Sequence, residues 1–143
     1  MFGLFKKKEA PRPAVSINDN VVEKAAGLLN TQLMLCRSQL GYKTGLEREI
    51  VRGYLVGFFD CALQKLGHPL GSDEEFAMLL LRGHSYLLGA DLADVRGFVF
   101  ASLRLQDNPQ FARGQAAGGN DCNDLLTGAS TRALTLMGYL IEG

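Results

Sequence analysis

Three residues combine reactive side chains with an apolar setting: Asp60, Arg82 and His84. Asp60 directly follows the apolar run 53–59, and a carboxylate is almost never fully buried without a partner. Arg82 and His84 interrupt the next apolar run along the chain, so we expect them to face Asp60 when the two runs pack together. With Tyr54, these side chains would line a pocket in which an acid or base of shifted pKa lies near an anion-binding arginine. They are therefore the candidate ligand-binding residues.

The same cluster has a structural interpretation, which we favour. A buried or half-exposed ion pair between Asp60 and Arg82 would fix the register of two helices, and such networks also shift pKa values. His84 lies in the middle of an expected helix, where a single histidine is more often a core residue with one hydrogen-bond partner. Ser85 lies beside His84, but adjacent helical residues face different directions and do not pair. No residue is therefore predicted to be catalytic, although an enzymatic bundle remains the alternative.

Neither a metal site nor a cofactor is predicted. His68 and His84 are far apart, and neither has a second His or Cys three or four positions away, which is the spacing of metal ligands on a helix. The glycine-rich segment 114–120 lacks the Lys-Ser/Thr pair of a P-loop and follows no expected strand.

Two apolar runs form the centre of the expected architecture. Residues 53–59 and 76–81 have no polar face in their middles, and helices that are apolar all round lie inside an assembly or a membrane. Neither run reaches the ~20 uninterrupted apolar residues that a bilayer crossing needs. We therefore expect the segment 46–89 to form a central antiparallel hairpin inside a soluble protein.

Capping residues and helix breakers delimit the remaining elements. Ser72 with Glu75 forms the capping-box pattern that starts a helix, and Pro109 is suited to the first position of another. No alternating stretch is long enough for a strand, so the fold class is all-α, a single-domain bundle of five or six helices. The expected helices cover residues 16–40, 46–66, 73–88, 92–103, 109–117 and 122–141, with a loop at 118–121 and a possible division of the last helix at Gly128.

Gly53 and Gly57 share one face of the second expected helix. Each costs about 1 kcal/mol relative to alanine in a helix interior. We expect the compensation to be close approach of a neighbouring helix backbone.

Composition restricts the class of protein. The chain has 15 basic and 15 acidic side chains, so no overall basic excess suggests a nucleic-acid surface. Three widely spaced cysteines fit neither a disulfide framework nor a zinc site, and a cytoplasmic location is the simplest expectation.

Residues 1–15 are expected to form a flexible basic arm preceding the helical domain at 16–143. An apolar tip followed by lysines could contact an anionic membrane surface, although a solvated terminus is the favoured interpretation. The candidate membrane-contact residues are Phe2, Leu4, Phe5, Lys6, Lys7 and Lys8.

The functional prediction is a non-catalytic protein–protein interaction or adaptor module that forms a homodimer and binds a further protein. Two all-apolar helices need cover on every side, and a second copy would supply part of that cover. The candidate dimer-interface residues, taken from the first and last helices, are Val22, Leu29, Leu33, Met137 and Leu140.

Overall fold

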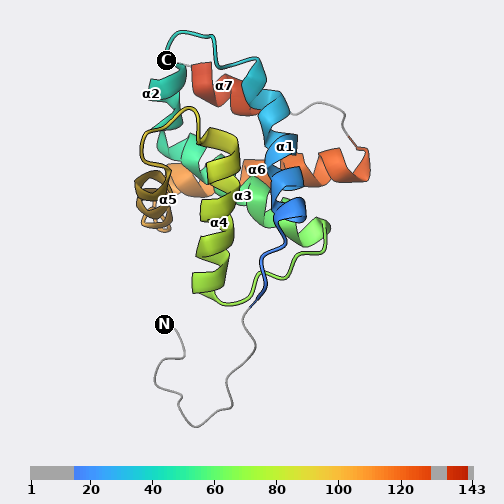
Figure 1. Cartoon of the computed structure of the whole chain (residues 1–143). Helices are drawn as coiled ribbons and strands as arrows, with labels where there is room; N and C mark the ends of the chain where they lie inside the picture. The colour runs from blue at the N-terminus through green and yellow to red at the C-terminus, as the bar shows by residue number, and fades with distance from the viewer. Residues whose placement is uncertain (1–14, 130–134, 142–143) are drawn as a thin grey trace.

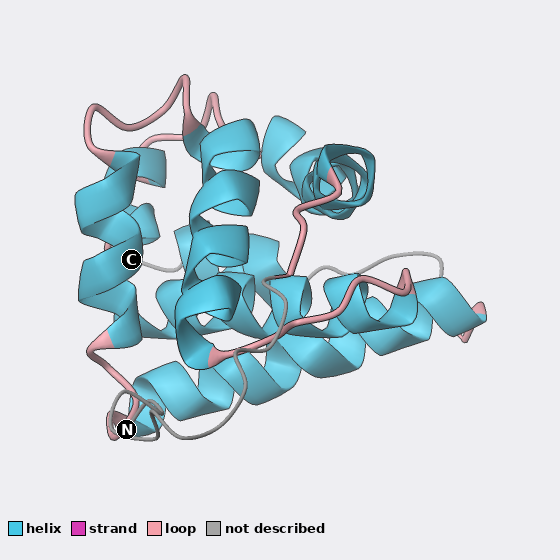
Figure 2. Ribbon diagram, turned by 60° about the horizontal axis from the view of Figure 1, so that its bottom comes forward, coloured by secondary structure: helices cyan, strands magenta, loops and turns pink. Residues whose placement is uncertain are grey.

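The computed structural model describes residues 15–129 and 135–141. Within those residues the chain forms seven helices and no strand (Figures 1 and 2), so the all-α prediction is confirmed. The helices are α1 (Asp19–Met34), α2 (Tyr42–Leu46), α3 (Glu49–Lys65), α4 (Asp73–Leu88), α5 (Val95–Leu103), α6 (Pro109–Thr127) and α7 (Thr135–Ile141).

Helix α4 begins and ends where the sequence predicts. The Ser72 hydroxyl accepts a hydrogen bond from the Glu75 amide at 3.2 Å, and the Glu75 carboxylate accepts one from the Ser72 amide at 2.8 Å. Both halves of the capping box are therefore present. Pro109 is the first residue of α6, as expected, with the Asn108 side chain as its cap.

Several predicted boundaries are wrong. Helix α1 ends at Met34 instead of continuing to residue 40, and its cap is Asn18, whose side chain accepts from the Asn20 and Val21 amides. The predicted loop at 118–121 lies inside α6, because its glycines face another helix and do not form a turn. The following break comes at Gly128, which has φ of 80° and ends α6.

The centre of the fold is α3, whose side chains are buried around most of its circumference. Its most extensive contacts are with α6, and further contacts come from α1, α7, α4, α5 and α2. The predicted antiparallel hairpin of α3 and α4 is not confirmed: α4 packs chiefly against α1 and meets α3 only locally. The cover that α3 needs therefore comes from elements of the same chain.

Four glycines form the seam between α3 and α6. A Cβ added at Gly53 would lie 2.0 Å from the Phe111 carbonyl oxygen, and one at Gly57 would lie 2.0 Å from that of Gln115. From the other side, Gly114 meets Ile50 and Gly118 meets Tyr54 at similarly short distances. Contacts advance along both helices together, so α3 and α6 are parallel.

Close backbone approach at Gly53 and Gly57 is thus confirmed, with α6 as the neighbour. Among the described residues, none of the helices combines the length and the apolar composition of a membrane span.

Candidate functional site

The predicted cluster of Asp60, Arg82 and His84 is not assembled. In the part of the chain that the structure describes, no hydrogen bond or ion pair joins any two of these side chains. Asp60 accepts a hydrogen bond from Gln64 at 2.7 Å on its own helix. Arg82 forms an ion pair with Asp19 of α1 at 2.6 Å, at the protein surface. The sequence could not reveal this arrangement, because it depends on α4 packing against α1.

His84 is a core residue, as its structural interpretation predicted. Its ring is fully buried between Phe59, with ring centroids 5.1 Å apart, and Phe98, at 6.0 Å. Nδ1 lies 2.8 Å from the Leu80 carbonyl oxygen, while the buried Nε2 has no hydrogen-bond partner among the described residues. Burial lowers the His84 pKa from 6.5 to about 4, so the ring is neutral near pH 7.

Tyr54 is also buried, away from Arg82. Its hydroxyl donates a 2.6 Å hydrogen bond to Asp121 of α6 and interacts with Gln32 of α1. Burial and the Asp121 hydrogen bond raise the pKa of Tyr54 above its ordinary value. Tyr54 therefore joins α1, α3 and α6 as a structural residue.

A buried arginine lies in the core near His84, and sequence reasoning did not single it out. The Arg52 guanidinium donates to the Phe98 carbonyl at 2.9 Å and to Ser102 Oγ at 2.8 Å, and it also pairs with Glu47. Its central carbon lies 4.1 Å from the centroid of the Phe98 ring, a cation–π distance. These contacts place Arg52 in a structural role between α3 and α5.

Asp60 lies beside a shallow hollow of about 220 Å³ at the α3–α6 seam. Drug-sized ligand sites occupy roughly 300–1,000 Å³ and are largely enclosed. The residues lining this hollow are Gly57, Asp60, Cys61, Gln64, Lys65, Gln115 and Gly119. Arg82, His84 and Tyr54 are not among them, so the hollow is not the predicted pocket.

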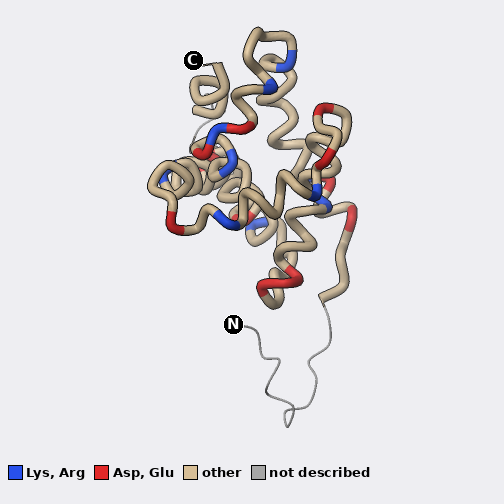
Figure 3. Tube along the Cα trace, turned by 90° about the vertical axis from the view of Figure 1, so that its left-hand side faces the viewer, with Lys and Arg blue, Asp and Glu red and all other residues tan. Residues whose placement is uncertain are grey.

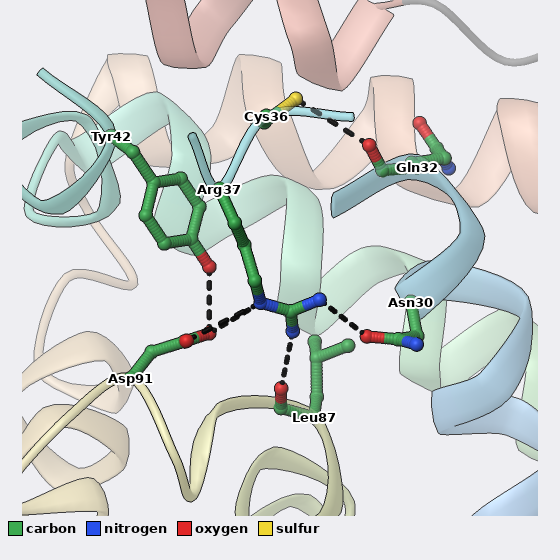
Figure 4. A network of polar contacts seen from close by, with 7 residues as sticks. All are labelled: Asn30, Gln32, Cys36, Arg37, Tyr42, Leu87 and Asp91. Atoms are coloured by element: carbon green, nitrogen blue, oxygen red, sulfur yellow. Dashed lines mark hydrogen bonds and ion pairs between the residues drawn. The ribbon is translucent and has the colours of Figure 1, made fainter. Parts of the chain in front are cut away.

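A second polar network fixes the connection between α1 and α2 (Figure 4). The Arg37 guanidinium donates to Asp91 at 3.0 Å, to Asn30 Oδ1 at 2.8 Å and to the Leu87 carbonyl at 2.9 Å. The Tyr42 hydroxyl donates to the same Asp91 carboxylate at 2.8 Å. The cap of the next helix, α5, is Asp94, whose side chain accepts from the Gly97 amide. One carboxylate, in the turn after α4, thus holds both Arg37 of the 35–41 connection and Tyr42 at the start of α2.

This connection carries the most exposed large apolar side chains among the described residues. Leu40 is 98% exposed, Leu35 is 65% exposed and Met34, at the end of α1, is 62% exposed. We call Met34, Leu35 and Leu40 the 34–40 surface. Sequence periodicity did not reveal this surface, because Leu40 continues the apolar spacing of α1.

The predicted dimer-interface residues are packed inside one chain. Val22, Leu29 and Leu33 are fully buried, and Leu140 is 2% exposed. They contribute to the core and are not available to a second copy in this structure. Met137 is partly buried against the same core. The candidate membrane-contact residues, Phe2 to Lys8, lie outside the described residues.

Positions occupied by Lys or Arg and positions occupied by Asp or Glu are interspersed along the described Cα trace (Figure 3), consistent with the neutral composition. No group of three or more His, Cys, Asp or Glu side chains within the described residues is arranged to hold a metal ion.

Substituting Asp91 tests whether this network fixes the connection. Asp91→Ala should lower the free energy of unfolding by about 2 kcal/mol, because it leaves the half-buried Arg37 and the buried Tyr42 without their shared acceptor. Tyr42→Phe, which removes one neutral donor, should cost about 1 kcal/mol. Urea titration measures both, and equal effects of the two changes would contradict the central position of Asp91.

Comparison with known proteins gives no match to a family model, a curated protein or a solved structure.

Proposed function

We propose that the chain is a non-catalytic, cytoplasmic protein-interaction module that self-associates through the 34–40 surface. The observation that carries the proposal is the combination of strong exposure and fixed position in this segment. Exposed apolar side chains that lie together are typical of interaction sites. Here the adjoining Cys36 is fully buried and Arg37 is held by three acceptors, so the apolar side chains extend from an anchored backbone.

Anchoring favours binding because a fixed surface loses less conformational entropy when a partner docks. Three side chains alone are too few for a stable interface, which buries about 800 Å² on each partner. Additional area is available at the same end of the molecule (Figure 1): α7 packs against α2, and its last residue, Ile141, is half exposed. The partner that we propose is a second copy of the chain, because a two-fold interface uses the same surface patch on both subunits.

The small-ligand or enzymatic alternative has weaker support. It required Asp60, Arg82, His84 and Tyr54 to converge on one pocket, and each has a separate set of partners. The hollow beside Asp60 is also smaller than a drug-sized ligand site.

Sedimentation velocity over a concentration series tests self-association. The intact chain should be dimeric at micromolar concentration, and the double variant Leu35→Lys and Leu40→Lys should weaken the dimer at least ~100-fold, because association would bury two unpaired charges. A matched control is Met78→Lys with Tyr86→Lys, which places the same two charges on exposed apolar positions of α4. The control should remain dimeric.

Three outcomes would contradict the proposal. The intact chain could remain monomeric at about 100 µM, a concentration at which even weak dimers form. The 34–40 variant could dimerise normally, which would place the interface elsewhere. Alternatively, both lysine variants could weaken the dimer equally, which would indicate a general effect of charge.

A further inference from the structure

The α3–α6 seam brings together two cysteines, Cys61 and Cys122, that have no role in the polar networks described above. Cys61 lies one helical turn after Gly57, and Cys122 lies one turn after Gly118. A Cβ at Gly118 would lie 2.9 Å from the Phe58 amide nitrogen, so residues 57–58 are in register with residues 118–119. Because the helices are parallel, the next turn of each places the two cysteines opposite one another.

The unusual closeness of this seam matters for their chemistry. Packed helix axes are normally about 8–10 Å apart, whereas a disulfide needs Cα atoms about 4.4–6.8 Å apart. Backbone contact across the glycines allows α3 and α6 to approach more closely than helices with larger side chains between them. The Cys61 thiol lies close enough to Cys122 to raise the pKa of the Cys122 thiol, and both cysteines are free.

The two thiols differ in their access to solvent. Cys61 is partly exposed and lines the 220 Å³ hollow, beside Lys65 and Asp60. Cys122 is fully buried beneath it. Burial raises the pKa of the Cys122 thiol, the adjacent Cys61 raises it further, and the Lys65 ammonium acts in the opposite direction.

We propose that Cys61 and Cys122 form a reversible dithiol–disulfide pair that covalently links α3 to α6 when a small-molecule disulfide such as oxidised glutathione reaches the hollow. This proposal does not depend on self-association through the 34–40 surface.

The reaction proceeds in two exchanges. The Cys61 thiolate attacks one sulfur of oxidised glutathione, which releases one glutathione thiolate and leaves a mixed disulfide on Cys61. The Cys122 sulfur then attacks the Cys61 sulfur and gives up its proton to the departing glutathione sulfur, so the second glutathione leaves as a thiol. Two protein thiols are oxidised, and one glutathione disulfide is reduced to two thiols. Cys61 reacts first because, of the two cysteines, only Cys61 lines the hollow that the glutathione disulfide enters.

The test is a titration of the intact, folded protein with mixtures of reduced and oxidised glutathione, followed by acid quenching, alkylation and non-reducing peptide mapping. The expected product is a peptide pair joining Cys61 to Cys122, with a mass loss of about 2 Da in the intact chain. Oxidation should also raise the thermal midpoint by an amount of the order of 10 °C, because the cross-link constrains a long loop in the unfolded chain.

Single variants test the order of events. Cys122→Ala should accumulate the glutathione adduct on Cys61, while Cys61→Ala should leave Cys122 unmodified as long as the protein is folded. Cys36 is a buried internal control whose thiol donates to the Gln32 carbonyl, and it should not react. The wild-type titration keeps the test decisive even if a variant fails to fold.

Absence of the Cys61–Cys122 peptide at full oxidation of the folded protein would overturn the proposal. So would an adduct on Cys61 that persists in the wild type, since Cys122 would then not resolve it. A disulfide that involves Cys36 would also overturn it.

Discussion

Replacing Gly118 with alanine should lower the free energy of unfolding by about 3 kcal/mol or more. The new Cβ would lie 2.1 Å from the Tyr54 carbonyl oxygen and 2.9 Å from the Phe58 amide nitrogen. Both contacts are to backbone atoms of a buried helix, so no side chain is able to rotate away and the two helices must separate. Overpacking of this kind costs more than the gain in helix propensity that alanine provides.

The neighbouring glycine provides a matched control. A Cβ at Gly119 would meet only the Gly57 carbonyl oxygen, at 3.8 Å, which is an ordinary contact. Gly119→Ala should therefore be neutral or slightly stabilising, and so should Gly27→Ala on α1, where nothing lies within 4 Å. Chemical denaturation followed by circular dichroism measures all three. Similar stabilities for the Gly118 and Gly119 variants would contradict a backbone seam.

Acidification should destabilise the protein through His84. The folded-state pKa is about 4 and the unfolded value about 6.5, so the unfolded chain binds the proton more tightly. The contribution of neutral His84 to the free energy of unfolding is fully present above pH 6.5. It is lost as the pH falls from 6.5 toward 4. The loss should amount to about 2 kcal/mol by pH 5 and about 3 kcal/mol by pH 4.

His84→Leu isolates this effect from the titration of carboxylates. Leucine is apolar, and the Leu80 carbonyl keeps its helical backbone partner, so the variant should fold at pH 7. Subtracting its stability from that of the wild type at each pH removes the contributions common to both proteins. A difference that stays constant between pH 7 and pH 4.5 would show that His84 titrates normally and is not buried as described.

Local signals predicted the helix class and several of the boundaries. The Ser72–Glu75 capping box and Pro109 each act through backbone groups within one turn, so they depend little on the rest of the fold. Glycine spacing at Gly53 and Gly57 correctly indicated close helix packing, because a helix interior tolerates two such residues only with compensation.

The partner of that packing could not be predicted. Gly114 and Gly118 repeat the same four-residue spacing, but clustered glycines are also typical of loops, and the chain was divided there. Apolar runs likewise indicate burial without naming the neighbour, so α4 was paired with α3 instead of α1. The predicted site failed for this reason: bringing Asp60, Arg82 and His84 together required a helix pairing that does not occur.

Nor could periodicity locate the exposed connection. Leu35 and Leu40 fit the apolar spacing of α1, yet the helix stops at Met34, and beyond it Arg37 and Tyr42 are held by Asp91. Their shared acceptor is distant in sequence, so no local pattern marks it.

The pairing of α3 with α6 has a consequence while the chain is being synthesised. Helix α3 leaves the ribosome well before α6, because α4 and α5 are translated between them. At about 5–20 residues per second, the nascent chain spends several seconds with the glycine face of α3 uncovered. During that interval the backbone groove that α6 later occupies is open to a chaperone. It is also open to the α3 helix of another copy of the chain that is being made on the same messenger RNA.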